Sequence, residues 1–291
     1  MTAPSTLRRR LSDGLFTMVA GPDGPAARER IHTTPGERWF PEGSPVQRVH
    51  GDASMYVGGI RALLLQSLHP LAMAGVDDFS DFRTDVWGRL ARTSTFLADT
   101  TFGTAEHAER AVRIVRAVHK RIVGTAPDGR PYAASDPHLL TWVHVAEVDS
   151  FLTAHQAFGA HPLTDAECDT YVEQASLVAT KLGAQDVPTS RAGLTATLEA
   201  FRPELESTPA ALDVARFLLR DAPLPWVAKP PYAVLCRGAV STLPRWAREP
   251  LHLKDSPRLD RTLGRAAGQV STRALRWLSS AQPAPTVAPH L

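Results

Sequence analysis

Apolar residues recur along most of this chain at the three- and four-residue spacing of amphipathic helices. The stretch AEHAERAVRIVRAVHKRIV, 105–123, shows this spacing clearly. One stripe of its helix is formed by Ala108, Ala111, Val112, Val115, Val118 and Ile122. Strict alternation of apolar and polar residues, which is typical of a half-buried strand, is not evident. The pattern therefore predicts an all-α protein.

Capping residues predict where several of these helices begin and end. A hydroxyl or carboxylate side chain before the first turn accepts an otherwise unpaired backbone N–H, and a glycine after the last turn stops the helix. A proline after the cap, or a glutamate three residues later, strengthens the start. The predicted starts are Thr104, Asp136 with Pro137, Thr164 with Glu167, and Thr208 with Pro209; the predicted stops are Gly124, Gly159 and Gly183.

The stretch SMYVGGIRALLLQSL, 54–68, is apolar nearly all round and contains the glycine pair Gly58–Gly59. A helix of this kind is usually buried on several sides, so we expect it at the centre of the fold. Residues 1–43 and 281–291 are rich in Gly, Pro or Arg without periodicity. We therefore expect one helical domain over 44–280, with an N-terminal arm before it and a disordered tail after it.

Composition narrows the function classes. The 32 Lys and Arg nearly balance the 30 Asp and Glu, so the net charge of +2 offers no general field that would attract nucleic acid. The only cysteines, Cys168 and Cys236, lie far apart in the sequence, which favours a protein of the reducing cytoplasm.

The basic triplet at 8–10 resembles the start of an export signal, but Asp13 and Gly14 interrupt the apolar run after it. No segment has the length of unbroken apolar sequence that a transmembrane helix needs.

His119 lies inside the apolar stripe of 105–123, four residues after Val115 and three before Ile122, so its imidazole should point inward. It is either a core histidine bonded to a carbonyl oxygen or an axial ligand of a b-type haem. No CxxCH motif for covalent haem attachment occurs. Arg116, three residues earlier, places a cation beside whatever the histidine contacts.

Two further histidines are candidates. His144 and Glu147 share a helix face, but a carboxylate di-iron site needs Glu-x-x-His motifs with further inward glutamates, and the order of this pair is reversed. A hydrogen bond inside the helical bundle is the favoured interpretation of this pair. His69 ends an apolar run before Pro70, where it either binds terminal carbonyls or lines a cavity.

The stretch GRLARTSTF, 88–96, places Arg89 and Thr93 four residues apart on one helix face, with Arg92 at its flank. A solvated charged face is the ordinary interpretation of such a run. Trp87, Leu90 and Phe96 are interleaved with the charges, however, and leave little purely polar surface.

Four ordered stretches together resemble the catalytic domain of latex clearing proteins and MpaB-type oxygenases. They are SPVQRVHGDASMYVGGIRALLLQSLHPLAMAGV, DVWGRLARTSTFLADTTFG, AVRIVRAVHKRIVG and GRPYAASDPHLLTWVHVAEVDSFLTAHQAFG, and the resemblance is strongest over 44–204. It implies an all-α, globin-like multi-helix domain that holds a non-covalent haem b and its iron. It also implies an oxygenase that acts on an apolar small molecule, isoprenoid or polyketide-like, with dioxygen or a peroxide.

The resemblance assigns roles to individual residues. His119 would be the iron ligand, since the family's Arg-x-x-His pattern falls on Arg116 and His119. Arg89 and Thr93 match the arginine and threonine of the family's haem pocket. Arg89, Arg92 and Arg116 would neutralise the haem propionates and help orient a bound oxygen species. Thr93 would donate a hydrogen bond on the distal side, and His69 and His144 would line or brace the pocket.

Arg92 stands where some latex clearing proteins carry a lysine that can bind the iron. A guanidinium does not lose its proton readily, so Arg92 would instead bind a haem propionate or a substrate carboxylate. Leu63 to Val76 contains no acidic residue, whereas the rubber-cleaving members have a glutamate upstream of the arginine. A haem or lipid-like ligand binder without turnover is therefore the alternative function, and a helical protein without cofactor is a third.

Overall fold

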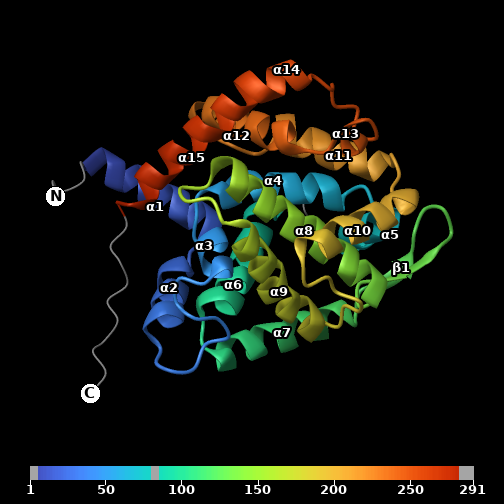
Figure 1. Cartoon of the computed structure of the whole chain (residues 1–291), viewed down its shortest axis with the longest axis horizontal. Helices are drawn as coiled ribbons and strands as arrows, with labels where there is room; N and C mark the ends of the chain where they lie inside the picture. Colours follow the sequence, from blue (N-terminus) through green and yellow to red (C-terminus); the bar gives the residue numbers. More distant parts are fainter. Residues whose placement is uncertain (1–5, 80–84, 282–291) are drawn as a thin grey trace.

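The computed structural model describes residues 6–79 and 85–281 of the chain. It confirms the all-α prediction, because helices account for nearly all regular structure in these ranges (Figure 1). The longer helices are α1 Thr6–Ala20, α2 Gly24–Thr33, α4 Ser54–Gln66, α5 Pro70–Phe79, α6 Val86–Phe102, α7 Ala105–His119, α8 Pro137–Phe158, α9 Asp165–Leu182, α10 Arg191–Phe201, α12 Lys229–Thr242 and α15 Arg265–Ser279.

Shorter helical pieces connect them: α3 Pro45–His50, α11 Pro209–Arg216, α13 Arg245–Arg248 and α14 Pro257–Leu259, with 3-10 turns η1 Arg202–Glu204 and η3 Trp226–Ala228 and π turns η2 Phe217–Asp221 and η4 Asp260–Gly264. The two strands of the described chain, β1 Val123–Thr125 and β2 Pro131–Ala133, pair in one antiparallel hairpin.

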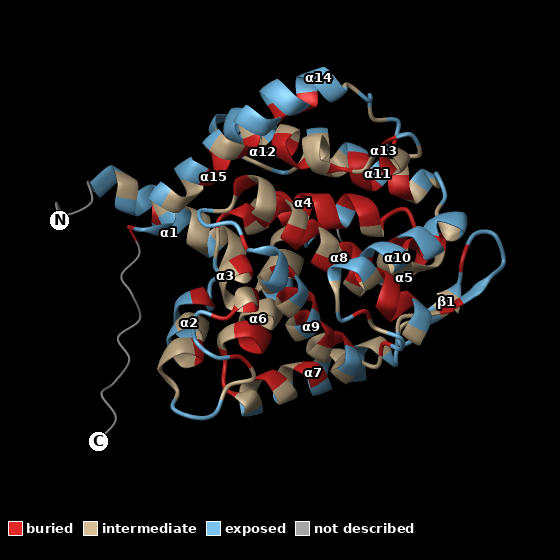
Figure 2. Cartoon of the chain, in the orientation of Figure 1, coloured by how far each residue is buried: buried red, intermediate tan, exposed pale blue. Residues whose placement is uncertain are grey.

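The helices α4 and α8 pack against each other along their length at the centre of the molecule. α12 and α15 cover them on one side, and α9 lies on the other side with α7 beyond it (Figure 1). α6 packs against α7. Most of the buried apolar side chains belong to one cluster around this central pair (Figure 2). The all-round apolar sequence of 54–68 thus predicted the central helix correctly.

The predicted caps are confirmed where helices begin. Thr104 accepts the His107 N–H, and Thr164 with Glu167 forms a complete capping box. Asp136 and Thr208 cap α8 and α11 in the same way. Gly159 and Gly183 end α8 and α9, and Gly183 takes the left-handed conformation at φ +112° that favours glycine.

The predicted stop at Gly124 is wrong. α7 ends at His119, and Gly124 lies inside β1 opposite Tyr132. A Cβ on Gly124 would come 2.5 Å from the Tyr132 hydroxyl oxygen, so glycine serves close packing in the hairpin rather than helix termination.

The N-terminal segment contains two packed helices where the sequence led us to expect an arm. α1 packs on α6 and α15, and Arg8 Nε donates to the Trp277 carbonyl oxygen at 3.0 Å. In α2, Arg30 pairs with Asp99 of α6 at 2.8 Å. These partners lie far away in sequence, so local periodicity could not reveal them. Of the expected tail, Ala281 is buried, and 282–291 lie outside the described residues.

No described helix combines the length and apolar character that crossing a bilayer requires.

Candidate functional site

The first turns of α6 carry a pair of neighbouring cations. Asp85 caps the helix by accepting the Gly88 N–H, and Arg92 pairs with Asp85 at 2.9 Å on the exposed surface. Arg89 is half-buried, and its pKa is lowered by burial first and by the charge of Arg92 second. Thr93, four residues after Arg89, is exposed. The first turns of α6 thus hold one partly desolvated guanidinium, Arg89, beside a second, Arg92, that is paired with Asp85.

His119 is the last residue of α7 and is half-buried, as the stripe predicted. Burial lowers its pKa, so the imidazole is neutral at pH 7. Its Nδ1 atom is buried and has no hydrogen-bond partner among the residues described. Within the described ranges, His119 therefore does not form the hydrogen bond to a carbonyl oxygen that is expected of a core histidine. Its neutral imidazole remains available as a ligand.

Arg116 is exposed, and its Nη1 donates to the Lys181 carbonyl oxygen of α9 at 3.2 Å. An arginine at the C-terminal carbonyls of a helix stabilises that end, so Arg116 joins α7 to α9. Arg116 thus links two helices, whereas His119, one helical turn later, is half-buried.

The middle of α8 carries two half-buried ionisable side chains, His144 and Glu147, whose pKa values are shifted by burial. Burial lowers the pKa of His144 to about 4 and raises the pKa of Glu147 to about 7. The Nε2 atom of His144 has no hydrogen-bond partner among the described residues, and neither side chain bonds the other. The expected hydrogen bond of this pair is therefore absent from the described structure, and both side chains are free for chemistry.

A buried polar chain lies beside Glu147. Tyr171 of α9 is fully buried, and Glu147 contributes, after burial, to raising its pKa. The Tyr171 hydroxyl lies 3.3 Å from His50 Nε2, and His50 Nδ1 lies 2.8 Å from Thr101 Oγ1. Burial lowers the pKa of His50 to about 4, so this chain of groups is uncharged at neutral pH.

Arg89, His119, His144, Glu147 and Tyr56 share one property. Each keeps some accessible surface, yet burial is the first cause of its pKa shift. The five side chains come from α4, α6, α7 and α8.

The structure places His69 elsewhere. Its ring lies 6.1 Å from the ring of Trp142 and 6.3 Å from that of Phe201, between centroids. Trp142 and His144 are two residues apart on α8, so they point about 200° apart around the helix. His69 therefore lies on the face of α8 that is opposite to His144, and it does not line the same space.

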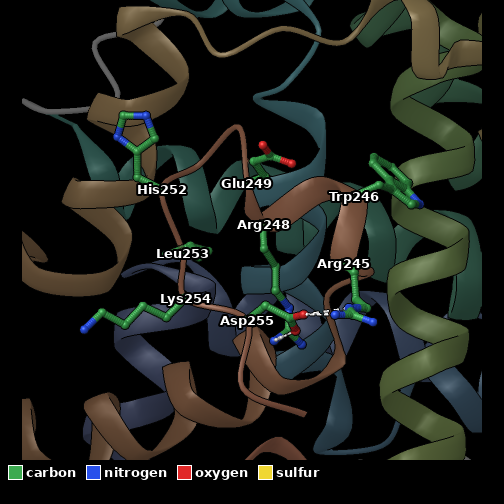
Figure 3. A pocket seen from close by; sticks show the side chains of 8 residues that line it. All are labelled: Arg245, Trp246, Arg248, Glu249, His252, Leu253, Lys254 and Asp255. Carbon is green, nitrogen blue, oxygen red and sulfur yellow. Dashed lines mark hydrogen bonds and ion pairs between the residues drawn. The ribbon is translucent and has the colours of Figure 1, made fainter.

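A surface cavity of 580 Å³ lies in the C-terminal part of the chain and contains none of the predicted site residues (Figure 3). Its wall is held by ion pairs of Asp255 with Arg245 and Arg248. Arg248 is buried and also donates to the Leu243 carbonyl oxygen at 3.1 Å. This cavity is therefore separate from the residues that the sequence singled out.

Sequence reasoning underrated Glu147 and did not find Tyr171 or His50. The signal for Glu147 was present, because an ionisable residue within the apolar sequence of α8 has to be buried or paired. His50 and Tyr171 are 121 positions apart, and the packing of α3 on α9 brings them together.

Comparison with known proteins gives one match. The family model described as "ER-bound oxygenase mpaB/B'/Rubber oxygenase, catalytic domain" matches residues 47–277, which include every candidate residue discussed above. No curated protein and no solved structure matches the chain. Since the match covers most of the chain, the protein belongs to the family of mpaB-type and rubber oxygenase catalytic domains.

Proposed function

We propose that the protein is a haem-b-dependent oxygenase of the cytoplasm that oxidises an apolar, isoprenoid or polyketide-like small molecule with dioxygen or a peroxide. The observation that carries the proposal is His119, a neutral, inward imidazole without a hydrogen-bond partner in the described chain. It lies within the part of the chain that the oxygenase family model matches. A bound haem b would supply the redox-active iron at which the oxidant is activated.

The residues present fit such a cofactor. His119 offers the neutral nitrogen ligand that haem iron takes from a protein. Arg89 and Arg92 would offer guanidinium groups to the two carboxylates of the porphyrin. Thr93, on the same helix, would donate a hydrogen bond from its Oγ1 to a bound ligand. Arg116 would brace the helix of His119 through Lys181.

Glu147 and His144 give the site a proton-handling pair. The carboxyl group of Glu147 is protonated at pH values below its pKa of about 7. The imidazole of His144 is neutral at pH values above its pKa of about 4. A carboxyl group with a pKa near the working pH can both donate and accept a proton during turnover. Glu147 would therefore fill the role of the acidic residue that is missing from Leu63 to Val76.

The experiment is reconstitution of the purified full-length protein with haemin, followed by visible absorption. Wild type is expected to give a stoichiometric Soret band, and His119→Ala is expected to lose it, because the ligand to iron is gone. The exposed His161 provides the control, and His161→Ala should bind as wild type does. A wild-type protein without a Soret band contradicts the proposal.

Turnover is tested on the reconstituted protein with a panel of terpenoids, given dioxygen with a reductant or a peroxide. Oxidised product that disappears in Glu147→Gln while the Soret band remains supports the oxygenase. Tight binding without product across the panel supports the alternative, a haem or lipid-like ligand binder.

A further inference from the structure

Three side chains that can bind a metal meet on the face of α8 that is opposite to His144. His69 comes from the turn between α4 and α5, His138 from the first turn of α8, and Glu204 from η1. One nitrogen or oxygen atom from each lies within 4.8 Å of the other two. Three segments that are distant in sequence thus bring two imidazoles and one carboxylate to one point.

The distances are close to those of a metal coordination sphere. His69 Nε2 lies 3.4 Å from Glu204 Oε2, and His138 Nε2 lies 2.9 Å from both carboxylate oxygens of Glu204. Ligands bound tetrahedrally to zinc at about 2.0–2.1 Å are separated by about 3.3 Å. Small side-chain rotations therefore bring all three into a zinc coordination sphere.

His69 is the observation that points to a missing ligand. Its side chain is only 2% exposed, and both of its ring nitrogens are buried without a hydrogen-bond partner in the described chain. The nearby Glu204 oxygen is outside hydrogen-bond geometry. A buried imidazole with two unsatisfied nitrogens costs free energy, and a metal ion would satisfy the nitrogen that faces the carboxylate.

The surrounding charges suit a divalent cation. The guanidinium of Arg130 is paired with two carboxylates, those of Asp128 and Glu206. Glu204 has its own negative charge directed into the cluster.

We propose that His69, His138 and Glu204 form a zinc site that is separate from the haem pocket. The ligand set of two imidazoles and one carboxylate is one that zinc uses, and imidazole nitrogen excludes magnesium and calcium as preferred ions. Three protein ligands leave the fourth position to water. Because His138 is 56% exposed, that position faces solvent, and the metal clips the α4–α5 turn to α8 and η1.

The test is calorimetric titration of the full-length protein with zinc chloride, after dialysis against EDTA. Wild type is expected to bind one zinc ion at this site. His138→Ala and Glu204→Gln remove partly exposed ligands, so they should fold normally and lower the zinc affinity at least tenfold. His161→Ala is the matched control on an exposed histidine, and it should bind zinc as wild type does.

A second readout is thermal unfolding. Zinc should raise the Tm of wild type and of His161→Ala, because a ligand that binds only the folded state stabilises it. The same zinc concentration should leave the Tm of His138→Ala unchanged. The proposal is overturned if wild type takes up no zinc, or if binding and stabilisation persist in both ligand variants.

This site does not depend on the proposed haem. Zinc could also reach the unpartnered His144, so the titration is repeated with His144→Ala. Zinc binding that is unchanged in this variant supports the assigned site, whereas binding lost only in His144→Ala overturns it.

Discussion

Gly58 of α4 lies directly against Phe151 of α8. A Cβ on Gly58 would come 2.8 Å from the ring carbon Cδ1 and 3.2 Å from the Cα of that phenylalanine. The two central helices therefore approach so closely that no larger residue fits without displacing one of them. Gly58→Ala is expected to lower the free energy of unfolding by about 1–3 kcal/mol, which urea denaturation measures.

Gly59 provides the matched control, since a Cβ there would meet nothing within 4 Å in the described chain. Gly59→Ala should be neutral, or stabilising by up to about 1 kcal/mol because alanine is the better helix former. Equal effects of the two substitutions would show that the close approach of α4 and α8 does not matter.

Arg61 links three helices from inside the core. Its guanidinium pairs with Asp149 at 2.7 Å, donates to Ser150 Oγ at 2.7 Å, and donates to the Thr242 carbonyl oxygen at 3.1 Å. Arg61→Met leaves these acceptors without their donor, so we expect a loss of about 3 kcal/mol in denaturant unfolding.

A surface arginine tests whether this loss comes from burial. Arg216 is 72% exposed and pairs with Asp221, so Arg216→Met should change stability by less than about 1 kcal/mol. A comparable loss in both variants would assign the effect to charge alone.

Glu147 should make the haem-free protein less stable as the pH rises. Its pKa is about 7 in the folded protein against 4.5 for the unfolded chain, so the folded state binds more protons between these values. The contribution is complete below pH 4.5 and is lost as the pH rises through 7. The loss is roughly 3 kcal/mol, since each pKa unit corresponds to about 1.4 kcal/mol.

Glu147→Gln stays neutral at every pH and isolates this effect from the buried histidines. Urea unfolding at pH 5 should give similar stabilities for the variant and wild type, and the variant should be more stable at pH 8. Parallel stability curves from pH 5 to pH 8 would contradict the raised pKa.

Arg89 should distinguish haemin from its dimethyl ester, which lacks the two carboxylates. If Arg89 binds a propionate, wild type prefers haemin by about tenfold to a hundredfold, the usual value of a charge-assisted hydrogen bond. Arg89→Met should lose most of this preference in absorption titrations. Arg113→Met, at an exposed position of α7, is the control, and an unchanged preference in Arg89→Met contradicts the role.

The sequence predicted those features that depend on neighbours within one helical turn. The capping box of Thr164 and Glu167 and the cap at Thr104 are complete within three residues, and both are as predicted. The inward position of His119 likewise follows from the spacing of its own helix. Such features are predictable because the groups that stabilise them are local.

Features that need a distant partner were not predictable in this way. α7 stops at His119 because Val123 pairs with Ala133, ten residues later, in the hairpin. α1 is held by Trp277, and His69 meets Glu204 through the packing of separate helices. Local periodicity contains no information about these contacts, so the N-terminal helices and the cluster at His69 emerge only from the folded chain.

The opposed faces of α8 have a thermodynamic consequence. One face carries His138 of the proposed zinc site, and the other carries His144 and Glu147 of the proposed haem pocket. If zinc changes the affinity for haem by some factor, linkage requires that haem change the affinity for zinc by the same factor. α8 thus contributes residues to both proposed sites. Measuring the effect of zinc on haem affinity therefore also gives the effect of haem on zinc affinity.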